Sequence, residues 1–321
     1  MQIGYKLATE AFGPHEIVRQ AQRAEQAGFD FVEMSDHYHP WFEAQGHSGF
    51  TWSMLGAVAA TTTDIGIAVG VTCPSYRYHP AIIAQAAATV AILSDGRFTL
   101  GLGAGERLNE HVTGQEFPPP RRRHGALREA IDVIRLLWSG GYRTYEGKHV
   151  RIEDARVFDL PKTLPAVPVA ASGPASAAIA AELGDGLFAT AADSSLVAGY
   201  HEAGGSGPCY GEVPVAWAPH QHDAARAALE TNSWALGGWN TMSELPNPQH
   251  FAAAASTVRI EDITASFACG PDPQTHIQAA QKFSDAGFDH LVLMNAGPDP
   301  DGFLDFYSGE LAGPLHALTP A

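Results

Sequence analysis

The sequence predicts a (β/α)8 barrel with insertions, which is an α/β fold. Eight short apolar runs alternate with longer amphipathic segments, and this alternation is typical of parallel strands joined by crossover helices. The length of 321 residues exceeds the roughly 250 residues of a typical barrel and leaves room for insertions. The alternative is a doubly wound open sheet, which would need a Gly-rich fingerprint after its first strand. The chain reads ATEAFGPHE there, so we favour the barrel.

The expected strands are short, apolar and bounded by turn residues, as buried parallel strands are. They are Ile3–Leu7, Phe29–Met34, Ile65–Val71, Phe98–Gly103, Val167–Ala171, Gly186–Ala189, Val213–Trp217 and His290–Met294. The clearest helical patterns between them are His15–Gln26, Pro80–Leu93, His124–Trp138, Ala175–Leu183, Asp223–Trp234 and Pro273–Ala286. Gly28 and Gly287 stand where two helices end before a strand, as left-handed caps do.

Two segments fall outside this repeat. Tyr142–Phe158 predicts a short hairpin, because the Glu-Gly-Lys at its centre suits a tight turn. Residues 236–260 form a second insertion, and Leu236–His250 within it is too long and too rich in Gly and Pro for a simple connector. We expect an irregular segment there, serving as a lid or binding loop. No linker or low-complexity tract divides the chain, so one domain is expected over residues 1–321.

The formal net charge of −16 is concentrated in the second half of the chain. Residues 181–321 contain only three basic side chains, Arg226, Arg259 and Lys282. Nucleic acids and anionic membranes bind basic surfaces, so neither is an expected partner. The three cysteines are far apart, which argues against a disulfide framework or a zinc site. No signal peptide and no membrane-spanning run is visible, so a cytoplasmic protein is expected.

Candidate chemistry follows the second strand. Active sites of barrels lie at the carboxyl ends of the strands, and Asp36 and His37 stand there. Such a pair can make a general base. The alternative is that Asp36 caps the next segment and His37 fills a loop. His39 adds only a weak metal-ligand pattern, and no metal is expected.

Three further segments favour a phosphate-bearing planar cofactor. Gly103–Glu106 lets the backbone approach a ligand closely, although a turn with a capping Glu is an equal alternative. Ser172–Pro174 opens a helix directly after a strand and can bind phosphate, or it is an ordinary N-cap followed by Pro. Arg121–Arg123 is most simply a solvated face, and contact with an anionic cofactor tail is the alternative.

Four segments resemble one known family. They are SDHYHPW (Ser35–Trp41), GVTCPSYRYHPAIIAQAAAT (Gly70–Thr89), LGLGAGERLNEHVTG (Leu100–Gly114) and CGPDP (Cys269–Pro273). They resemble the luciferase-like flavin and deazaflavin oxidoreductase superfamily, most closely the branch typified by F420-dependent glucose-6-phosphate dehydrogenase. The resemblance covers essentially the whole chain. It implies a (β/α)8 barrel that binds coenzyme F420, a 5-deazaflavin that carries hydride and does not activate oxygen as flavins do.

The resemblance also implies roles for residues at matching positions. His37 would exchange the proton of an alcohol, Glu106 would assist protonation at the N1 side of the deazaflavin, and Trp41 would shield the reacting centre. Gly70 and Val71 match a non-proline cis peptide bond beside the ring. The implied cofactor-binding residues are Asp36, Gly70, Val71, Cys73, Gly105, Glu106, Asn109, Ala171, Ser172, Gly173 and Pro174.

The chain departs from the sugar-phosphate branch where the substrate would bind. Trp41, Thr190 and Asp193 are the expected substrate residues, and Asp193 stands where sugar-phosphate enzymes place a Lys. Ala252–Ala255 and Ile263–Ala268 likewise lack a cation. A carboxylate repels a phosphate dianion, so glucose 6-phosphate is not the expected substrate. We expect a non-phosphorylated alcohol, carbonyl compound or conjugated alkene instead.

Two other functions stay open at this stage. An FMN-dependent monooxygenase of the same superfamily would use an overlapping ring site. A flavin-binding protein that stores or senses cofactor without turnover is the third hypothesis, and the joint presence of His37, Trp41 and Glu106 argues against it. Relatives commonly form homodimers, and the Ala- and Ile-rich segment Pro80–Leu93 offers an isologous face. The alternative for that helix is burial against the barrel.

Overall fold

The computed structural model describes residues 1–321. Eight parallel strands close into a barrel in the order β1-β2-β3-β4-β7-β8-β9-β11, and β11 pairs with β1. Their bounds are β1 Gln2–Leu7, β2 Phe31–Met34, β3 Gly66–Thr72, β4 Phe98–Leu102, β7 Pro168–Ala170, β8 Gly186–Ala189, β9 Cys209–Ala216 and β11 His290–Asn295. The fold is therefore the (β/α)8 barrel that the sequence predicts.

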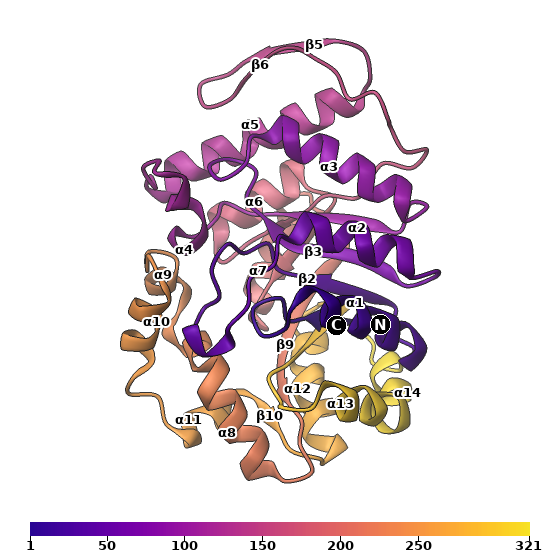
Figure 1. Cartoon of the computed structure of the whole chain (residues 1–321), viewed down its shortest axis with the longest axis vertical. Coiled ribbons are helices and arrows are strands. Elements are labelled where there is room, and N and C mark those ends of the chain that lie inside the picture. The colour runs from indigo at the N-terminus through magenta and orange to yellow at the C-terminus, as the bar shows by residue number, and fades with distance from the viewer.

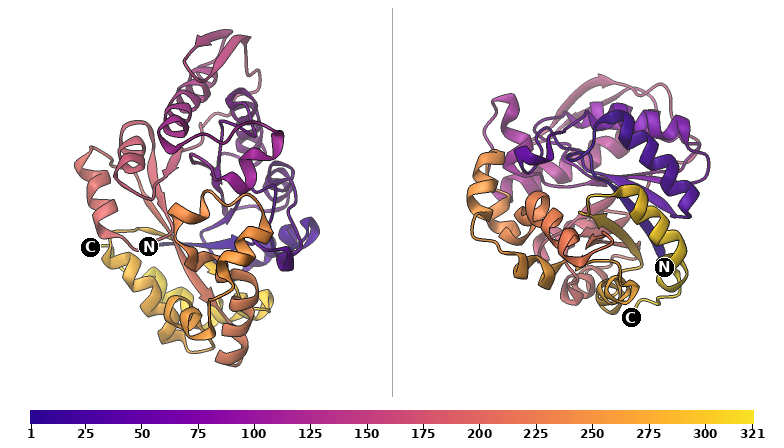
Figure 2. Two further views of the ribbon diagram at one scale, coloured as in Figure 1. Left: turned by 90° about the vertical axis from the view of Figure 1, so that its left-hand side faces the viewer. Right: turned by 60° about the horizontal axis from the view of Figure 1, so that its bottom comes forward.

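Helices surround the barrel, and the two chain ends lie beside each other (Figures 1 and 2). The α-helices are α1 Pro14–Ala27, α2 Thr51–Thr61, α3 Pro80–Leu93, α4 Arg107–Glu110, α5 Pro120–Trp138, α6 Pro174–Leu183, α7 Ser194–Glu202, α8 Gln221–Asn232, α9 Trp239–Met242, α10 Pro248–Ala255, α11 Ile260–Ser266, α12 Pro273–Asp285, α13 Pro300–Phe306 and α14 Ala312–His316. Short 3-10 turns occupy η1 Glu43–Gln45, η2 His111–Thr113 and η3 Ser233–Gly237, and a π-helical turn occupies η4 Tyr307–Leu311. No helix combines the length and apolar character needed to cross a bilayer.

Beyond shifts of one or two residues at strand ends, the strands differ from the expected ones in two places. β9 begins at Cys209 rather than at Val213, because Gly211 and Glu212 interrupt the apolar run that marks a buried strand. A further short strand, β10 (Ala268–Cys269), pairs only with the end of β9. Two residues are too few to produce a recognisable pattern.

The two insertions have different structures. β5 (Arg143–Glu146) and β6 (Arg151–Ala155) pair antiparallel in the first one, at one end of the molecule's long axis (Figure 1). The expectation of an irregular segment at residues 236–260 is wrong, because this insertion is mostly helical. The side chain of Asn247 caps α10 by accepting from the His250 N–H at 3.1 Å, and Pro and a run of Ala follow, which favour a helix.

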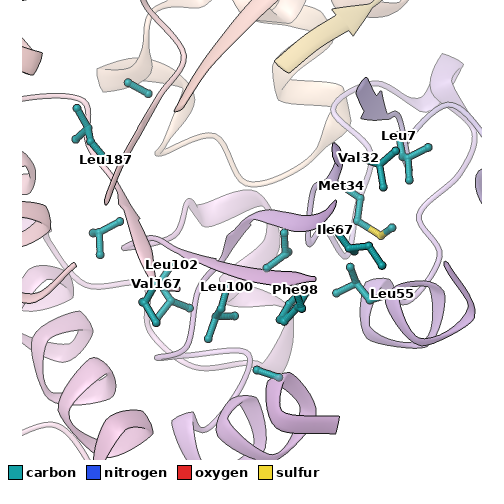
Figure 3. Close-up of a cluster of buried hydrophobic side chains, with 14 of the residues drawn as sticks. Leu7, Val32, Met34, Leu55, Ile67, Phe98, Leu100, Leu102, Val167 and Leu187 are labelled. Carbon is teal, nitrogen blue, oxygen red and sulfur yellow. The ribbon is translucent and has the colours of Figure 1, made fainter. Parts of the chain in front are cut away.

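Side chains alternate between the two faces of each barrel strand. The outward ones pack against the helices in the largest apolar cluster, and Figure 3 shows part of it, including Leu7, Val32 and Ile67. Phe31, Phe188 and Tyr210 alternate with these and fill the barrel interior. Phe188 and Tyr210 stack with ring centroids 5.6 Å apart. The interior is therefore a packed aromatic layer and not a channel.

Candidate active site

His37 and Glu10 form a close pair at the carboxyl end of the barrel. Each follows its strand, β2 or β1, by three residues, and these strands are neighbours. The Nδ1 atom of His37 lies 2.8 Å from Oε1 of Glu10, and their side chains are only 10% and 5% exposed. The carboxylate lies against the Nδ1 side of the ring, which leaves Nε2 as the atom available for proton transfer.

Surrounding charges set the protonation of this pair. Burial disfavours a charged imidazole, but Glu10 and Glu106 outweigh both burial and the repulsion of Lys6, so the pKa of His37 is raised above its ordinary 6.5. Burial also opposes ionisation of Glu10, yet His37 and Lys6 hold the pKa of Glu10 at about 2. Glu10 is thus a fixed anion near neutral pH, and His37 is the member of the pair that exchanges protons.

Asp36 has a carboxylate saturated by donors from within the protein. Its Oδ2 accepts from Thr72 Oγ1 at 2.7 Å and from Trp52 Nε1 at 3.2 Å. Its Oδ1 accepts from Arg77 Nη2 at 3.0 Å and from the Tyr78 hydroxyl at 3.1 Å. A direct bond from this carboxylate to a cofactor would displace one of these donors. The observed contacts make Asp36 an anchor for the loop after β2.

Arg77 joins this anchor to a second buried carboxylate. Its backbone N–H donates to Glu110 Oε2 at 2.9 Å, and its Nε lies 3.6 Å from Oε1. Burial raises the pKa of Glu110 to about 7, although Arg77 opposes the shift. Arg77 therefore connects the loop after β3 to the loops after β2 and β4.

Asn109 connects the His37 loop to Glu106. Its Oδ1 accepts the backbone N–H groups of Tyr38 at 2.7 Å and His39 at 3.0 Å. Its Nδ2 donates to Glu106 Oε1 at 2.5 Å, and the residue is fully buried. One amide thus fixes the distance between the two proposed catalytic segments.

The histidine that suggested a metal ligand is engaged elsewhere. His39 Nδ1 lies 3.1 Å from the carbonyl oxygen of Leu108. No group of three or more His, Cys, Asp or Glu side chains lies close enough together to hold a metal ion. His39 thus adds a further contact between the loops after β2 and β4.

Trp41, Trp234 and Phe251 form an aromatic wall beside His37. The Trp41 and Trp234 rings stack with centroids 4.1 Å apart and planes 14° apart. The Phe251 and Trp41 rings meet edge-on with centroids 5.1 Å apart. The His37 and Trp41 rings also meet edge-on, with centroids 4.7 Å apart. Trp234 lies in η3 and Phe251 in α10. The segment between β9 and β10 therefore supplies two of the three rings.

A charged cluster lies inside the barrel near the ends of β1 and β2. Lys6 Nζ is 2.8 Å from Glu33 Oε1 and 2.9 Å from Glu212 Oε2. Burial raises the pKa of Glu33 to about 8, although Lys6 opposes the shift. Lys6 therefore links two buried carboxylates, and Glu33 is the one whose pKa burial raises.

Bare backbone lines the ends of β3 and β4. A Cβ atom on Gly103 would lie 2.6 Å from a Val71 methyl carbon, and one on Gly105 would lie 2.7 Å from Cys73 Sγ. The Gly70–Val71 peptide bond is cis, as the resemblance implied. No side chain can occupy these glycine positions without displacing a neighbour. The two glycines therefore let the segments that follow β3 and β4 pack closely against each other.

The expected phosphate loop lies where β7 ends and α6 begins. Ala171 is buried, and Ser172 and Pro174 are exposed. The Ser172 N–H donates to Ser176 Oγ at 3.1 Å. This helix start has the polarity that attracts an anion, so the phosphate role of Ala171, Ser172, Gly173 and Pro174 stays a prediction.

Two expected substrate residues lie after β8. Thr190 and Asp193 are both exposed. Asp193 Oδ1 accepts from the N–H of Ser195 at 2.9 Å and from that of Leu196 at 3.3 Å, so it caps α7. A capping carboxylate at this helix start disfavours a phosphate there. Whether either residue touches substrate stays a prediction.

Sequence reasoning did not select Glu10, Arg77 or Trp234. A signal existed for Glu10, since it follows the first predicted strand by the same offset at which His37 follows the second. No local signal marks Trp234, because its partner Trp41 is far away in the sequence.

Comparisons with known proteins agree on one family. The model of the luciferase-like monooxygenase family matches residues 1–290. The F420-dependent hydroxymycolic acid dehydrogenase of Mycobacterium tuberculosis is 41% identical over 315 residues, covering 95% of this chain and 86% of that protein. The F420-dependent glucose-6-phosphate dehydrogenase of Microbacterium testaceum is 35% identical, covering 97% and 96%.

A solved structure is similar along nearly the whole chain. An F420-dependent secondary alcohol dehydrogenase in complex with an F420–acetone adduct superimposes with a TM-score of 0.90. It is 29% identical, and the match covers 98% of both chains. The insertions are therefore also largely within the shared fold.

Proposed function

The chain belongs to the luciferase-like monooxygenase family, and from this premise we propose that it is an F420-dependent oxidoreductase, a dehydrogenase or reductase. Support comes from relatives at 33–41% identity, which are F420-dependent dehydrogenases. The FMN-dependent monooxygenase alternative has weaker support, because two similar monooxygenase structures, RslO1 and LadA, are only 18% and 14% identical. The observation that carries the proposal is the buried His37–Glu10 pair beside the aromatic wall.

The residues present fit a deazaflavin. Gly103 and Gly105 let the ends of β3 and β4 pack closely together beside Val71 and Cys73, at the carboxyl end of the barrel where His37 and Glu106 lie. The start of α6 at Gly173 and Pro174 has the polarity for a phosphate. We propose that these segments hold the ring and the phosphate of the cofactor. When bound, the deazaflavin supplies a ring carbon that accepts or donates hydride.

The chain's own residues manage the proton and the geometry. In alcohol oxidation, neutral His37 takes the hydroxyl proton through Nε2 while Glu10 stabilises the resulting imidazolium. In carbonyl reduction, the same imidazolium returns the proton. Glu106 is held by Asn109 and is placed to assist a proton on the cofactor side. Trp41 excludes water from one side of the reacting centre.

We propose a non-phosphorylated alcohol, carbonyl compound or conjugated alkene as substrate. Asp193 places a carboxylate at the start of α7. The basic side chains of residues 181–321 are exposed at Arg226, Arg259 and Lys282, and Arg226 pairs with Asp223. The aromatic wall offers apolar contact instead of charge, which suits an uncharged substrate.

Two measurements test this function in sequence. The purified protein is titrated with F420 and with FMN, and the cofactor that binds is then used in a screen of secondary alcohols, enones and glucose 6-phosphate. We expect F420 to bind and an uncharged substrate to exchange hydride with it. Preferential FMN binding with oxygen consumption would overturn the cofactor assignment, and robust turnover of glucose 6-phosphate would overturn the substrate class.

We also propose a homodimer through α3. The helix buries one face against the barrel, and Ile82 and Leu93 are 57% and 47% exposed on the other. Light scattering should give twice the chain mass for the wild type and the single chain mass for Ile82→Asp. An unchanged mass in the variant would exclude this face as the dimer contact.

A further inference from the structure

Arg123 is a buried cation with unused donors. It lies in the first turn of α5. Its neighbours Arg121 and Arg122 are exposed, whereas Arg123 is buried. Its side chain is 5% exposed. Its Nε and Nη1 atoms are shielded from solvent and have no acceptor in the protein. The solvated-face interpretation of the arginine run is therefore wrong for Arg123 and correct for its two neighbours.

The only acceptor near this guanidinium is a half-exposed carboxylate. Arg123 Nη2 donates to Glu244 Oε1 at 3.2 Å, and the Glu244 side chain is 50% exposed. The guanidinium also lies over the Phe117 ring, 4.2 Å from its centroid. A buried charge with unpaired donors is costly. The two unpaired donors of Arg123 therefore favour an anionic acceptor that the protein itself does not supply.

A second unpaired group lies on the same aromatic ring. The Tyr76 hydroxyl is shielded and has no partner, and the Tyr76 and Phe117 rings meet edge-on at 6.4 Å. Both Arg122 and Arg123 influence the titration of Tyr76, so the hydroxyl lies within their field. Two unused polar groups, one from α5 and one from the loop after β3, therefore flank Phe117.

The loop after β3 links this location to the proposed cofactor residues. Tyr76 belongs to the loop that begins at Cys73, and Cys73 packs against Gly105. We place the cofactor tail along this loop, toward Phe117 and Arg123. The α6 start would then hold one anionic group and Arg123 another.

We propose that Arg123 and Tyr76 form an oxyanion subsite, which binds a phosphate or carboxylate in the anionic tail of the cofactor. Arg123 offers unpaired N–H donors at Nε and Nη1, charge-assisted bonds from a guanidinium to such anions are strong, and Tyr76 offers a further donor. Glu244 competes for the guanidinium. The assignment to the cofactor tail rests on the proposed function, whereas the oxyanion subsite itself does not.

Two ligands and three variants test the subsite. Dissociation constants are measured by fluorescence for F420 and for its deazariboflavin core, which lacks the phosphate and the tail. We expect Arg123→Met to weaken F420 about 10–100-fold, as loss of charge-assisted hydrogen bonds does, and to leave the core unaffected. Arg121→Met removes the same charge from an exposed position and should change neither. Glu244→Gln should tighten F420 binding and keep the fold intact, because it removes only a half-exposed charge.

Each outcome assigns or removes the subsite. Equal effects of Arg123→Met on F420 and on the core, with no effect of Glu244→Gln, would overturn it. If glucose 6-phosphate stabilises F420-loaded enzyme in an Arg123-dependent way, the anion comes from a substrate and the tail assignment is wrong. If F420 does not bind the wild type, the proposed function fails. Inorganic phosphate then tests the subsite by itself. If it raises the melting temperature of the wild type and not of Arg123→Met, the subsite stands; if it raises neither, the subsite is wrong.

Discussion

The loops after β1 to β4 and the helical segment between β9 and β10 build opposite sides of one site by different means. In the loops, buried polar groups pair with named partners, as Asp36 does with four donors. The helical segment contributes stacked and edge-on rings, such as Trp234 and Phe251 against Trp41. Its polar links to the loops are few, and Arg107 N–H to Ser243 carbonyl at 2.9 Å is one of them.

The difference teaches where chemistry and selectivity reside. A buried polar network is satisfied in one geometry, so it holds His37 and Glu106 in place. Apolar packing is not directional and tolerates changes that conserve volume. We therefore expect the loops to determine reaction rate and the aromatic wall to determine which substrates fit.

The largest expected effect comes from breaking the proton-transfer group on the loop side. His37→Asn should lower kcat about 10²–10⁴-fold, as loss of a general base does, and should leave the dissociation constant of F420 unchanged. Stopped-flow hydride transfer and a fluorescence titration measure the two quantities. Tyr38→Phe, at an adjacent exposed residue, is the matched control. A His37→Asn enzyme with near-normal kcat would remove this residue from catalysis.

Breaking the network should cost stability. Asp36→Ala leaves Arg77 without one carboxylate and removes four hydrogen bonds, so the free energy of unfolding should fall by about 3–5 kcal/mol. Denaturant titration measures it. Asp193→Ala, at an exposed cap, should lower the free energy of unfolding by much less. Equal losses in the two variants would contradict the distinction between a buried anchor and a surface cap.

The pH profile sharpens the loop side further. Glu10 raises the pKa of His37, and alcohol oxidation needs the neutral imidazole. Glu10→Gln should therefore shift the acid limb of kcat/KM to lower pH, because the imidazolium loses its stabilising charge. Glu43→Gln, at an exposed residue, is the control and should leave the limb in place. An acid limb that stays in place in Glu10→Gln would mean that another group titrates.

The smallest expected effect lies on the aromatic wall. Trp234→Leu keeps an apolar side chain and should raise KM for bulky apolar substrates about 10-fold, within the range for lost contact in an apolar pocket, with little change in kcat. Steady-state kinetics on a series of alcohols of rising size measures this. A fall in kcat as large as that of His37→Asn would show that the wall is part of the proton-transfer geometry.

Much of the fold follows from local pattern. Buried strands such as Phe98–Leu102 are contiguous apolar runs, and α1 is amphipathic and closed by Gly28 in the left-handed conformation. The helical character of residues 236–260 was missed, although Asn247 and Pro248 followed by alanines are a helix-start signal. The Gly and Pro content of the segment outweighed it.

The site was predictable only in part. His37, Trp41 and Glu106 stand at strand ends in recognisable motifs. The pairing of His37 with Glu10 and of Trp41 with Trp234 arises from barrel closure, which joins residues that no sequence period connects. The local sequence also does not predict which side chains are buried. Arg121 and Arg123 belong to the same arginine run, yet Arg121 is exposed and Arg123 is buried.

The packed interior of the barrel has a consequence for the timing of turnover. Phe31 precedes Glu33 by two residues, and Tyr210 precedes Glu212 by two, so the aromatic layer lies on the amino-terminal side of the charged cluster. Bulk water has no route through that layer. A proton taken up by His37 must depart through the same opening that admits substrate. The proton and the product therefore leave through the same opening, one after the other. A product that leaves slowly delays both.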